Sequence, residues 1–371
     1  MPTQYAIDCF AENYFDARDK FLAACAPLPG QLKSLRQPVA HYENRPLFTD
    51  VFRLGSEQAE KVLIVISGTH GVEGFCGSAA QINWLRQQTV PDNDIALLFI
   101  HALNPYGFAH LRRVNEDNID LNRNFIDFTK VPVNEGYRQL ASVLLPPQWT
   151  ESCNREALMT LANYAEQHGR RQTEEAVSGG QYQYADGLFY GGSKPSWSRR
   201  NIETLIQDYH LSKRGAVVVI DIHSGLGPYG YGELISDHPP LSPAALRARR
   251  WFGDSVTEPA LGTSTSVLKQ GLLDYAWHDA LGDRGCCLTL EFGTYAVDEM
   301  FRVLREENYF RQQFFREGIA SESLQNARQR LRDYFFPDKE DWKEMVLFRS
   351  CQVMRQALAG LKSKPSAHDM R

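Results

Sequence analysis

The sequence has no long uninterrupted apolar segment and no strong excess of one charge. Residues 1–21 carry acidic and basic side chains throughout, which is atypical of a signal peptide, and no later apolar run is long enough to cross a membrane. The net charge of -5 and a pI near 6.1 do not provide the positive field that binding to nucleic acid or to an anionic membrane requires. We therefore expect a cytoplasmic protein that binds neither nucleic acid nor membranes.

Two further absences narrow the chemistry. The seven cysteines are scattered, odd in number and without a Cys-x-x-Cys pair, so they are typical of reduced thiols. Cys76 could be a nucleophile, but small buried cysteines are common in protein cores. No Gly-x-Ser-x-Gly elbow occurs, and Ser224 beside His223 lacks the arrangement of a serine hydrolase.

Short apolar runs rich in β-branched residues are separated by helix-like stretches. A chain of 371 residues with 43% hydrophobic content can bury one large core or two modest ones. The apolar runs read as buried strands of a central sheet, and a helix is expected at about 77–88. This alternation predicts an α/β fold. The predicted strands are 62–66, 95–100, 216–222 and 286–292.

The remaining segments predict an insertion and a helical C-terminal part. The interval 125–214 lacks a strong strand signal, and we expect helices near 134–143 and 151–168 followed by a long loop. We expect a single catalytic domain over residues 1–361, with an insertion at about 126–214, a helical extension from about 297 and a frayed tail at 362–371. The extension should pack over the sheet as amphipathic helices at 297–317, 321–334 and 342–361.

Metal-binding residue types stand where two predicted strands end. His70 and Glu73 follow the strand at 62–66, and His223 follows the strand at 216–222. Open α/β sheets place ligands at the carboxyl ends of their strands. Two imidazoles and one carboxylate suit a zinc ion, so the sequence predicts a zinc hydrolase. His70 and Glu73 by themselves could instead form a capped turn.

The motifs resemble a known family. The pair His70-x-x-Glu73 is followed by Asn104-Pro105, by Arg113 leading to Asp120-Leu121-Asn122-Arg123, by His223, and by Glu291 in Leu288-Thr289-Leu290-Glu291-Phe292-Gly293. In this order they resemble the zinc carboxypeptidases and the related aspartoacylases and succinylglutamate desuccinylases. The resemblance covers roughly residues 60–296 and points to a carboxypeptidase-like family of uncharacterised function. It implies a three-layer α/β/α sandwich around a mixed, mostly parallel sheet.

The resemblance also implies roles for single residues. His70, Glu73 and His223 would bind one Zn²⁺ ion and leave a fourth position open, as in catalytic zinc sites. Glu291 would be the general base, and Arg113 would stabilise the oxyanion.

Three more residues would complete the site. Asn122 and Arg123 would hold the free carboxylate of the substrate, and Asp120 would hydrogen-bond His70 and fix its tautomer. Asn122 and Arg123 could also form a structural ion pair or a loop brace, and Asp120 could be a turn cap.

The sequence departs from the family pattern at two places. Segment 263–269 has no tyrosine where carboxypeptidases carry a mobile one, and Tyr229 or Tyr231 could replace it. The gap between Arg123 and His223 is long, so the insertion should reshape the pocket. Leu273 hints at an apolar side-chain pocket.

These features predict a zinc hydrolase that cleaves an amide next to a free carboxylate. The first expectation is carboxypeptidase-like cleavage of short peptides, and the alternative is an amidohydrolase that releases the acyl group of an N-acyl amino acid. The competing hypothesis is a metal-binding protein without hydrolytic activity. The oligomeric state is not predicted.

Overall fold

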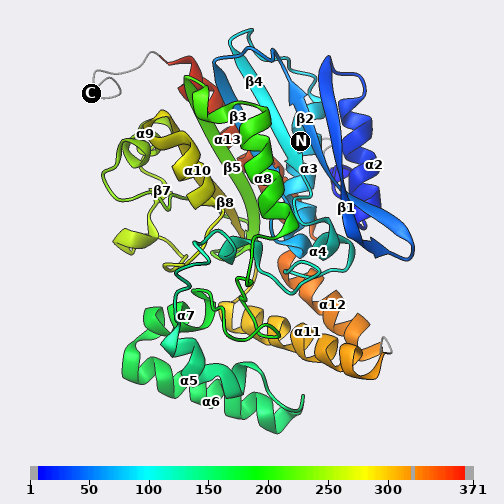
Figure 1. Ribbon diagram of the computed structural model, residues 1–371, viewed down its shortest axis with the longest axis vertical. Coiled ribbons are helices and arrows are strands. Elements are labelled where there is room, and N and C mark those ends of the chain that lie inside the picture. Colours follow the sequence, from blue (N-terminus) through cyan, green and yellow to red (C-terminus); the bar gives the residue numbers. More distant parts are fainter. Residues whose placement is uncertain (1–6, 319–321, 364–371) are drawn as a thin grey trace.

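The computed structural model describes residues 7–318 and 322–363 (Figure 1). Its centre is an eight-stranded sheet with the order β1-β2-β4-β3-β5-β8-β6-β7. The strands are β1 (Gly30–Tyr42), β2 (Arg45–Leu54), β3 (Lys61–Ser67), β4 (Ile95–His101), β5 (Ala216–Gly225), β6 (Gly232–Ile235), β7 (Val256–Thr257) and β8 (Gly285–Gly293).

The middle of the sheet is parallel and its margins are mixed. β4, β3, β5 and β8 run in the same direction, whereas β2 pairs antiparallel with β4 and β6 pairs antiparallel with β8. The predicted mixed, mostly parallel sheet is therefore confirmed. Because β3, β5 and β8 are parallel, their carboxyl ends lie at the same edge of the sheet.

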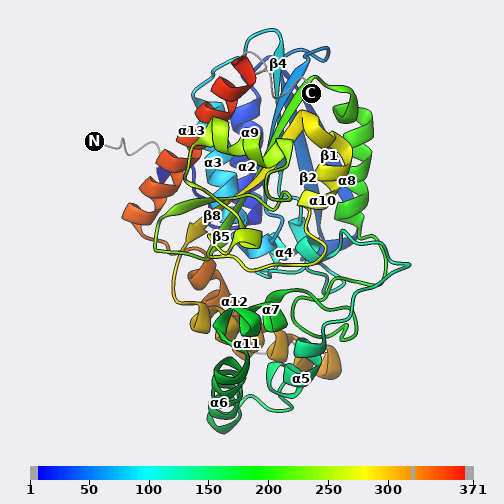
Figure 2. The same ribbon diagram turned by 90° about the vertical axis from the view of Figure 1, so that its left-hand side faces the viewer.

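Helices cover both faces of the sheet, because successive apolar side chains of a strand point to opposite sides. On β3, Leu63 and Val65 pack into the core formed with α2, α3, α9 and α13. Ile64 and Ile66 pack on the other face, with α8 and α10. Figure 2 shows the resulting three layers. These helices are α2 (Tyr14–Cys25), α3 (Gly74–Arg86), α8 (Trp197–Asp208), α9 (Pro243–Phe252), α10 (Asp274–Leu281) and α13 (Glu340–Lys362).

A second group of helices lies beyond the carboxyl ends of the central strands, as both views show (Figures 1 and 2). Tyr137, Val177 and Leu304 belong to a hydrophobic cluster of their own between these helices. The insertion and the chain after Glu291 thus form one wall beside the end of the sheet. The helices are α5 (Glu135–Leu144), α6 (Glu151–His168), α7 (Arg170–Ser178), α11 (Val297–Glu317) and α12 (Glu322–Phe335).

Short helices complete the connections. These are α4 (Pro105–Ala109) and the 3-10 turns η1 (Gly71–Glu73), η2 (Leu121–Arg123), η3 (Leu211–Lys213), η4 (Pro259–Leu261) and η5 (Gly282–Arg284). Within the described residues, no helix combines the length and the apolar character needed to span a bilayer.

Two expectations about the fold were wrong, and four strands were not predicted. The long loop expected after residue 168 contains the helices α7 and α8. The helix α8 forms because Ser196 caps its N-terminus and because Ile202 and Leu205 are buried. Of the C-terminal helices only α13 packs over the sheet, because the apolar faces of α11 and α12 pack into the cluster shared with the insertion. The margin strands β1, β2, β6 and β7 were missed.

The missed strands have a physical cause. Most side chains of β1 are exposed, so its sequence lacks a long apolar run. β6 and β7 are only four and two residues long. Residues 364–371 of the expected tail, and Ser321 at the start of one predicted helix, lie outside the described residues.

Candidate metal centre

A glycine-mediated contact positions the turn that carries His70 and Glu73. A Cβ atom on Gly71 would lie 2.0 Å from the carbonyl carbon of Gly107, so the two backbones touch. The Gly71 N–H donates to the carbonyl of Arg113 over 3.1 Å. The turn after β3 is therefore fixed directly against the segment that brings Arg113 to the site.

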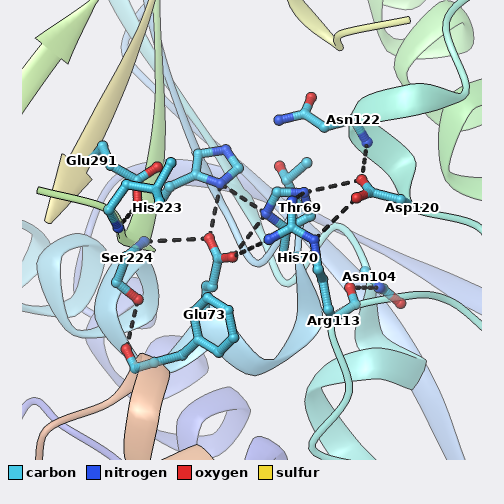
Figure 3. A network of polar contacts seen from close by, with 12 residues as sticks. Thr69, His70, Glu73, Asn104, Arg113, Asp120, Asn122, His223, Ser224 and Glu291 are labelled. Carbon is cyan, nitrogen blue, oxygen red and sulfur yellow. Dashed lines mark hydrogen bonds and ion pairs between the residues drawn. The ribbon is translucent and has the colours of Figure 1, made fainter. Parts of the chain in front are cut away.

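Three side chains from two strand ends converge on one point (Figure 3). Nδ1 of His70 lies 2.9 Å from Glu73 Oε1, and Nδ1 of His223 lies 2.9 Å from Glu73 Oε2. The two Nδ1 atoms are 3.1 Å apart. All three residues are buried, and one ligand atom from each lies within 4.8 Å of the others. Tetrahedral zinc bonds of about 2.0–2.1 Å would place ligand atoms about 3.3 Å apart, so this donor set fits such an ion with small adjustments.

A carboxylate holds the far nitrogen of each imidazole. His70 Nε2 lies 3.1 Å from Asp120 Oδ1, and His223 Nε2 lies 2.7 Å from Asp221 Oδ2. A proton on each Nε2 leaves the Nδ1 lone pair free for a cation, which is the usual carboxylate–histidine–metal arrangement. Asp221 also accepts a hydrogen bond from the Thr69 hydroxyl.

Asp221 was not predicted as a site residue, although its position in the sequence indicates the role. Asp221 and His223 lie two residues apart on β5, so their side chains leave the same face of the strand. An acid two residues before a candidate ligand on a strand can reach the ligand's outer nitrogen.

The charges at the centre favour a cation. Burial alone would raise the pKa of Glu73, but the imidazoles of His70 and His223 hold this pKa far below its usual value. Burial opposes the charged form of His223, yet Asp221 and Glu73 raise its pKa well above the usual value. The carboxylates therefore require nearby positive charge. A divalent ion with neutral imidazoles can supply it in place of imidazole protons.

Arg113 lies against the candidate ligands rather than apart from them. Its Nη1 donates to Glu73 over 2.9 Å, and its Nε donates to Asp120 over 3.0 Å. Its Nη2 is 2.8 Å from His70 Nε2, the same nitrogen that faces Asp120. If that nitrogen carries the proton and donates to Asp120, it cannot also accept from Arg113. The oxyanion role of Arg113 stays a prediction.

Glu291 stands beside His223 on the neighbouring strand. The two residues are register partners at the carboxyl ends of β8 and β5. Burial, together with the negative charge of Glu73, raises the pKa of Glu291 to about 7. The Leu226 N–H donates to its Oε1 over 3.0 Å. A carboxylate with such a pKa is suited to take up and release a proton near neutral pH.

Arg123 and Asn122 both line the pocket, but their present contacts also brace loops. Arg123 donates from Nε and Nη2 to the carbonyl of Ser178, over 3.0 and 2.6 Å. Asn122 accepts from the Leu273 N–H over 2.9 Å. Burial lowers the pKa of Arg123, and the negative charge of Asp120 acts in the opposite direction. Arg123 is thus a buried cation that forms no ion pair with an acidic side chain in the described ranges.

The pocket also contains a charged residue that was not predicted. Lys269 lines it, and its Nζ donates to the Ser266 hydroxyl and, over 3.0 Å, to the carbonyl of Val267. Burial and the nearby Arg123 lower the pKa of Lys269 to about 8. Asp237 is the neighbouring pocket residue whose negative charge acts in the opposite direction. Lys269 ends the segment in which the family tyrosine was sought.

Two weaker expectations were wrong. Tyr229 and Tyr231 are 37% and 47% exposed and do not line this pocket, and no tyrosine does so in the described part of the chain. Leu273 is completely buried in the core on one face of the sheet, whereas its neighbour Leu272 lines the pocket. The turn into α10 decides which of these two leucines faces the pocket. The sequence pattern does not reveal the direction of this turn.

Together, the fold and this cluster define an α/β protein with a buried His-Glu-His group able to hold a metal ion at the carboxyl end of its sheet. Residues 10–349 match a protein family described as "Protein of unknown function (DUF2817)". The chain belongs to that family. A comparison with curated proteins found no match.

Solved structures with similar folds were also found. Thrombin activatable fibrinolysis inhibitor is 14% identical, with 78% of this chain and 70% of that chain covered and a TM-score of 0.43. An aspartoacylase family protein from Mesorhizobium loti is 15% identical, with 72% and 62% covered and a TM-score of 0.35. A succinylglutamate desuccinylase from a Silicibacter species is 14% identical, with 78% and 67% covered and a TM-score of 0.37. Because these TM-scores are below 0.5, we base no functional statement on them.

Proposed function

We propose that this protein is a zinc-dependent hydrolase that cleaves an amide bond next to a free carboxylate. The observation that carries the proposal is the convergence of His70, Glu73 and His223, with Glu291 in register beside His223. Two imidazoles and one carboxylate are the ligand set of zinc hydrolases, and a neighbouring carboxyl with a pKa near neutrality is what such a reaction needs.

The protein groups divide the work of hydrolysis. A zinc ion held by the three ligands would supply Lewis acidity to the scissile carbonyl and to water. Glu291 would accept the proton of the attacking water and return it to the leaving amine. Asp120 and Asp221 would hold the two imidazoles in the ligating tautomer.

Arg113 would stabilise the charge that develops on the carbonyl oxygen. At present its Nη1 contacts Glu73. A metal ion held by Glu73 would compete with Arg113 for this carboxylate. The fixed charge of the guanidinium would suit the negative charge that appears during the reaction.

The cationic part of the pocket accounts for the free carboxylate of the substrate. Arg123 has no paired acid among the described residues, and Lys269 lies near it in the same pocket. The Asn122 amide stands next to them. A carboxylate there would receive charge-assisted hydrogen bonds. Short peptides and N-acyl amino acids both provide this group beside an amide.

Metal analysis of three purified proteins tests the proposal. The wild type should contain one zinc ion per chain and hydrolyse a suitable amide. The variant His70→Ala should lose both the metal and the activity, whereas Glu291→Gln should keep the metal and lose turnover. Equal zinc in the wild type and His70→Ala would contradict the ligand assignment. Wild type with full zinc and no turnover on a broad panel would favour the metal-binding protein without hydrolytic activity.

A substrate panel separates the two kinds of amide. It pairs peptides that have a free C-terminus with N-acyl amino acids, and each substrate is tested beside its amidated form. The amidated controls should fail, because they cannot bind the cationic residues as anions. Equal cleavage of free and amidated substrates would contradict the carboxylate requirement.

A further inference from the structure

A second cavity lies next to the candidate active-site pocket. It has a volume of about 430 Å³ and lies between α6, α7 and α11. Glu174, Val297 and Phe301 line both the pocket and this cavity, so the two spaces meet at these residues. The volume falls in the range of small-molecule sites, which is about 300–1,000 Å³.

One wall of the cavity is an apolar stripe that is only partly covered by other side chains. Leu158, Leu161, Ala162 and Ala165 follow the i, i+3, i+4, i+7 spacing on α6, and all four line the cavity. Such a stripe normally packs against a core. Here only Ala157 of α6 is buried, and Leu158 is 54% exposed. Leu161 also packs against the cluster that contains Val177 and Leu304, so the stripe lines the cavity at the margin of that core.

The charged side chains of the cavity are mostly neutralised by one another. Arg170 Nε donates to Glu174 over 3.1 Å, and Arg302 pairs with Glu299. Ionic partners hold these groups in place. The other polar residues of the lining are Asn154, Thr173, Asp298 and Arg305, and the remaining residues are apolar. The cavity thus suits a chain that is uncharged along most of its length.

Residues of α11 give the direction and the length of the cavity. Val297, Phe301 and Arg305 succeed one another at four-residue spacing, and the first two also line the active-site pocket. At about 1.5 Å per residue, the cavity extends roughly 12 Å along the helix from Val297 to Arg305. Arg305 Nη1 donates to Asn154 over 3.3 Å, and its buried Nη2 has no hydrogen-bond partner among the residues that the structure describes.

We propose that this cavity is an acyl subsite, and that the substrates are N-acyl amino acids with an apolar acyl chain of intermediate length. This inference rests on the proposed function. The carboxylate of the amino acid binds beside Arg123 and Lys269, the amide lies at the metal centre, and the acyl chain extends between α6 and α11. Hydrolysis consumes one water and releases the free amino acid and the fatty carboxylate.

A series of acyl chains on one amino acid tests the subsite. N-acetyl, N-hexanoyl and N-decanoyl substrates are compared by kcat/KM. Each methylene buried in the cavity improves binding by up to about fourfold, so kcat/KM should rise at least tenfold from acetyl to decanoyl. Chains that reach beyond Arg305 should gain nothing more.

A matched pair of variants locates the effect. Ala162→Phe places a ring in the cavity and should abolish the tenfold gain while N-acetyl cleavage stays unchanged. Asn163→Phe adds the same ring to the next residue of α6, which does not line the cavity, and should behave as the wild type. No gain with chain length, or a gain that Ala162→Phe leaves intact, would overturn the subsite.

Binding measurements separate this inference from the proposed function. Thermal shift with N-decanoyl and N-acetyl amino acids reports binding without turnover. If the wild type hydrolyses nothing but binds the decanoyl compound more tightly, and Ala162→Phe removes the difference, the hydrolase proposal fails and the subsite stands. Hydrolysis without any chain-length effect gives the reverse result. The wild type could also be a dimer that Ala162→Phe dissociates. That result would show that the cavity wall on α6 binds a second copy of the chain, and it would overturn the subsite.

Discussion

His223 and Glu291 are register partners at the carboxyl ends of the adjacent parallel strands β5 and β8. A candidate metal ligand and a candidate general base are therefore held by the hydrogen-bonded ladder of the sheet, and not by mobile loops. Both side chains line the same pocket. Positions on a sheet are reproducible within small distances, which is what proton transfer next to a metal ion requires.

The variant Glu291→Gln should lower kcat by about 10²–10⁴-fold and leave the metal content unchanged. The amide of glutamine keeps the shape of the side chain and can still accept from the Leu226 N–H, but it cannot take a proton from water. Steady-state kinetics and metal analysis on the same preparation check this. Glu166→Gln, on the exposed surface of α6, serves as the control. Loss of metal in Glu291→Gln would assign this residue to the ligand set.

The activity should depend on pH through the same carboxyl. Glu291 must be ionised to act as a base, and burial raises its pKa to about 7. The value of kcat/KM should therefore fall as the pH drops below the pKa of Glu291. The midpoint should lie at about 7 or below, because a bound cation favours the carboxylate. A pH–rate profile from pH 5 to 9 measures it. A profile that stays flat over this range, with the same shape in Glu291→Asp, would count against Glu291 as the base.

Asp221→Asn should weaken zinc binding by about 10- to 100-fold. The carboxylate lies 2.7 Å from His223 Nε2 and holds the tautomer that presents Nδ1 to the metal. Competition with a zinc chelator gives the dissociation constant. Asp117→Asn, at an exposed position, should bind zinc as tightly as the wild type. Unchanged affinity in Asp221→Asn would show that the strand alone orients His223.

Lys269→Met should raise KM for carboxylate substrates by about ten- to hundredfold, with a smaller effect on kcat. The ammonium lies in the pocket near Arg123, and its pKa is about 8. The KM of the wild type should therefore rise as the pH passes 8 and Lys269 loses its charge. The variant should lack this rise. Lys194→Met, an exposed lysine, is the control, and an unchanged KM in Lys269→Met would remove Lys269 from substrate binding.

Cys76→Ala should retain zinc and hydrolytic activity. The thiol is completely buried, and burial raises its pKa well above the usual value, with Glu291 and Glu73 adding to the effect. A thiol that remains protonated is a poor nucleophile. The substitution should cost about 1 kcal/mol of unfolding free energy, measurable by urea denaturation. Loss of activity with normal folding and zinc content would support Cys76 as a nucleophile.

Much of the central architecture could be predicted from the sequence, because buried parallel strands carry uninterrupted apolar runs. The runs at β3, β4, β5 and β8 are all present in the sheet. α8 could not be recognised in the same way, because its apolar side chains are sparse and it depends on packing against the sheet through Ile202 and Leu205. The pattern of apolar residues along the sequence therefore reveals a helix or strand only where most of its side chains are buried.

The candidate site divides along a similar line. His70, Glu73, His223 and Glu291 could be selected because their residue types follow strands at the edge where parallel strands end. Lys269 could not, because its approach to Arg123 depends on how the loop before α10 folds back to the pocket.

The sequence by itself determined which residues can bind a cation and which strands carry them, because residue type and apolar patterning are local properties. Only the tertiary structure decided that Arg113 contacts Glu73 and that the insertion forms a cavity with α11. Those relationships join segments whose distance and direction are set by packing. Packing depends on the shapes of all the side chains between them, and spacing along the chain does not record it.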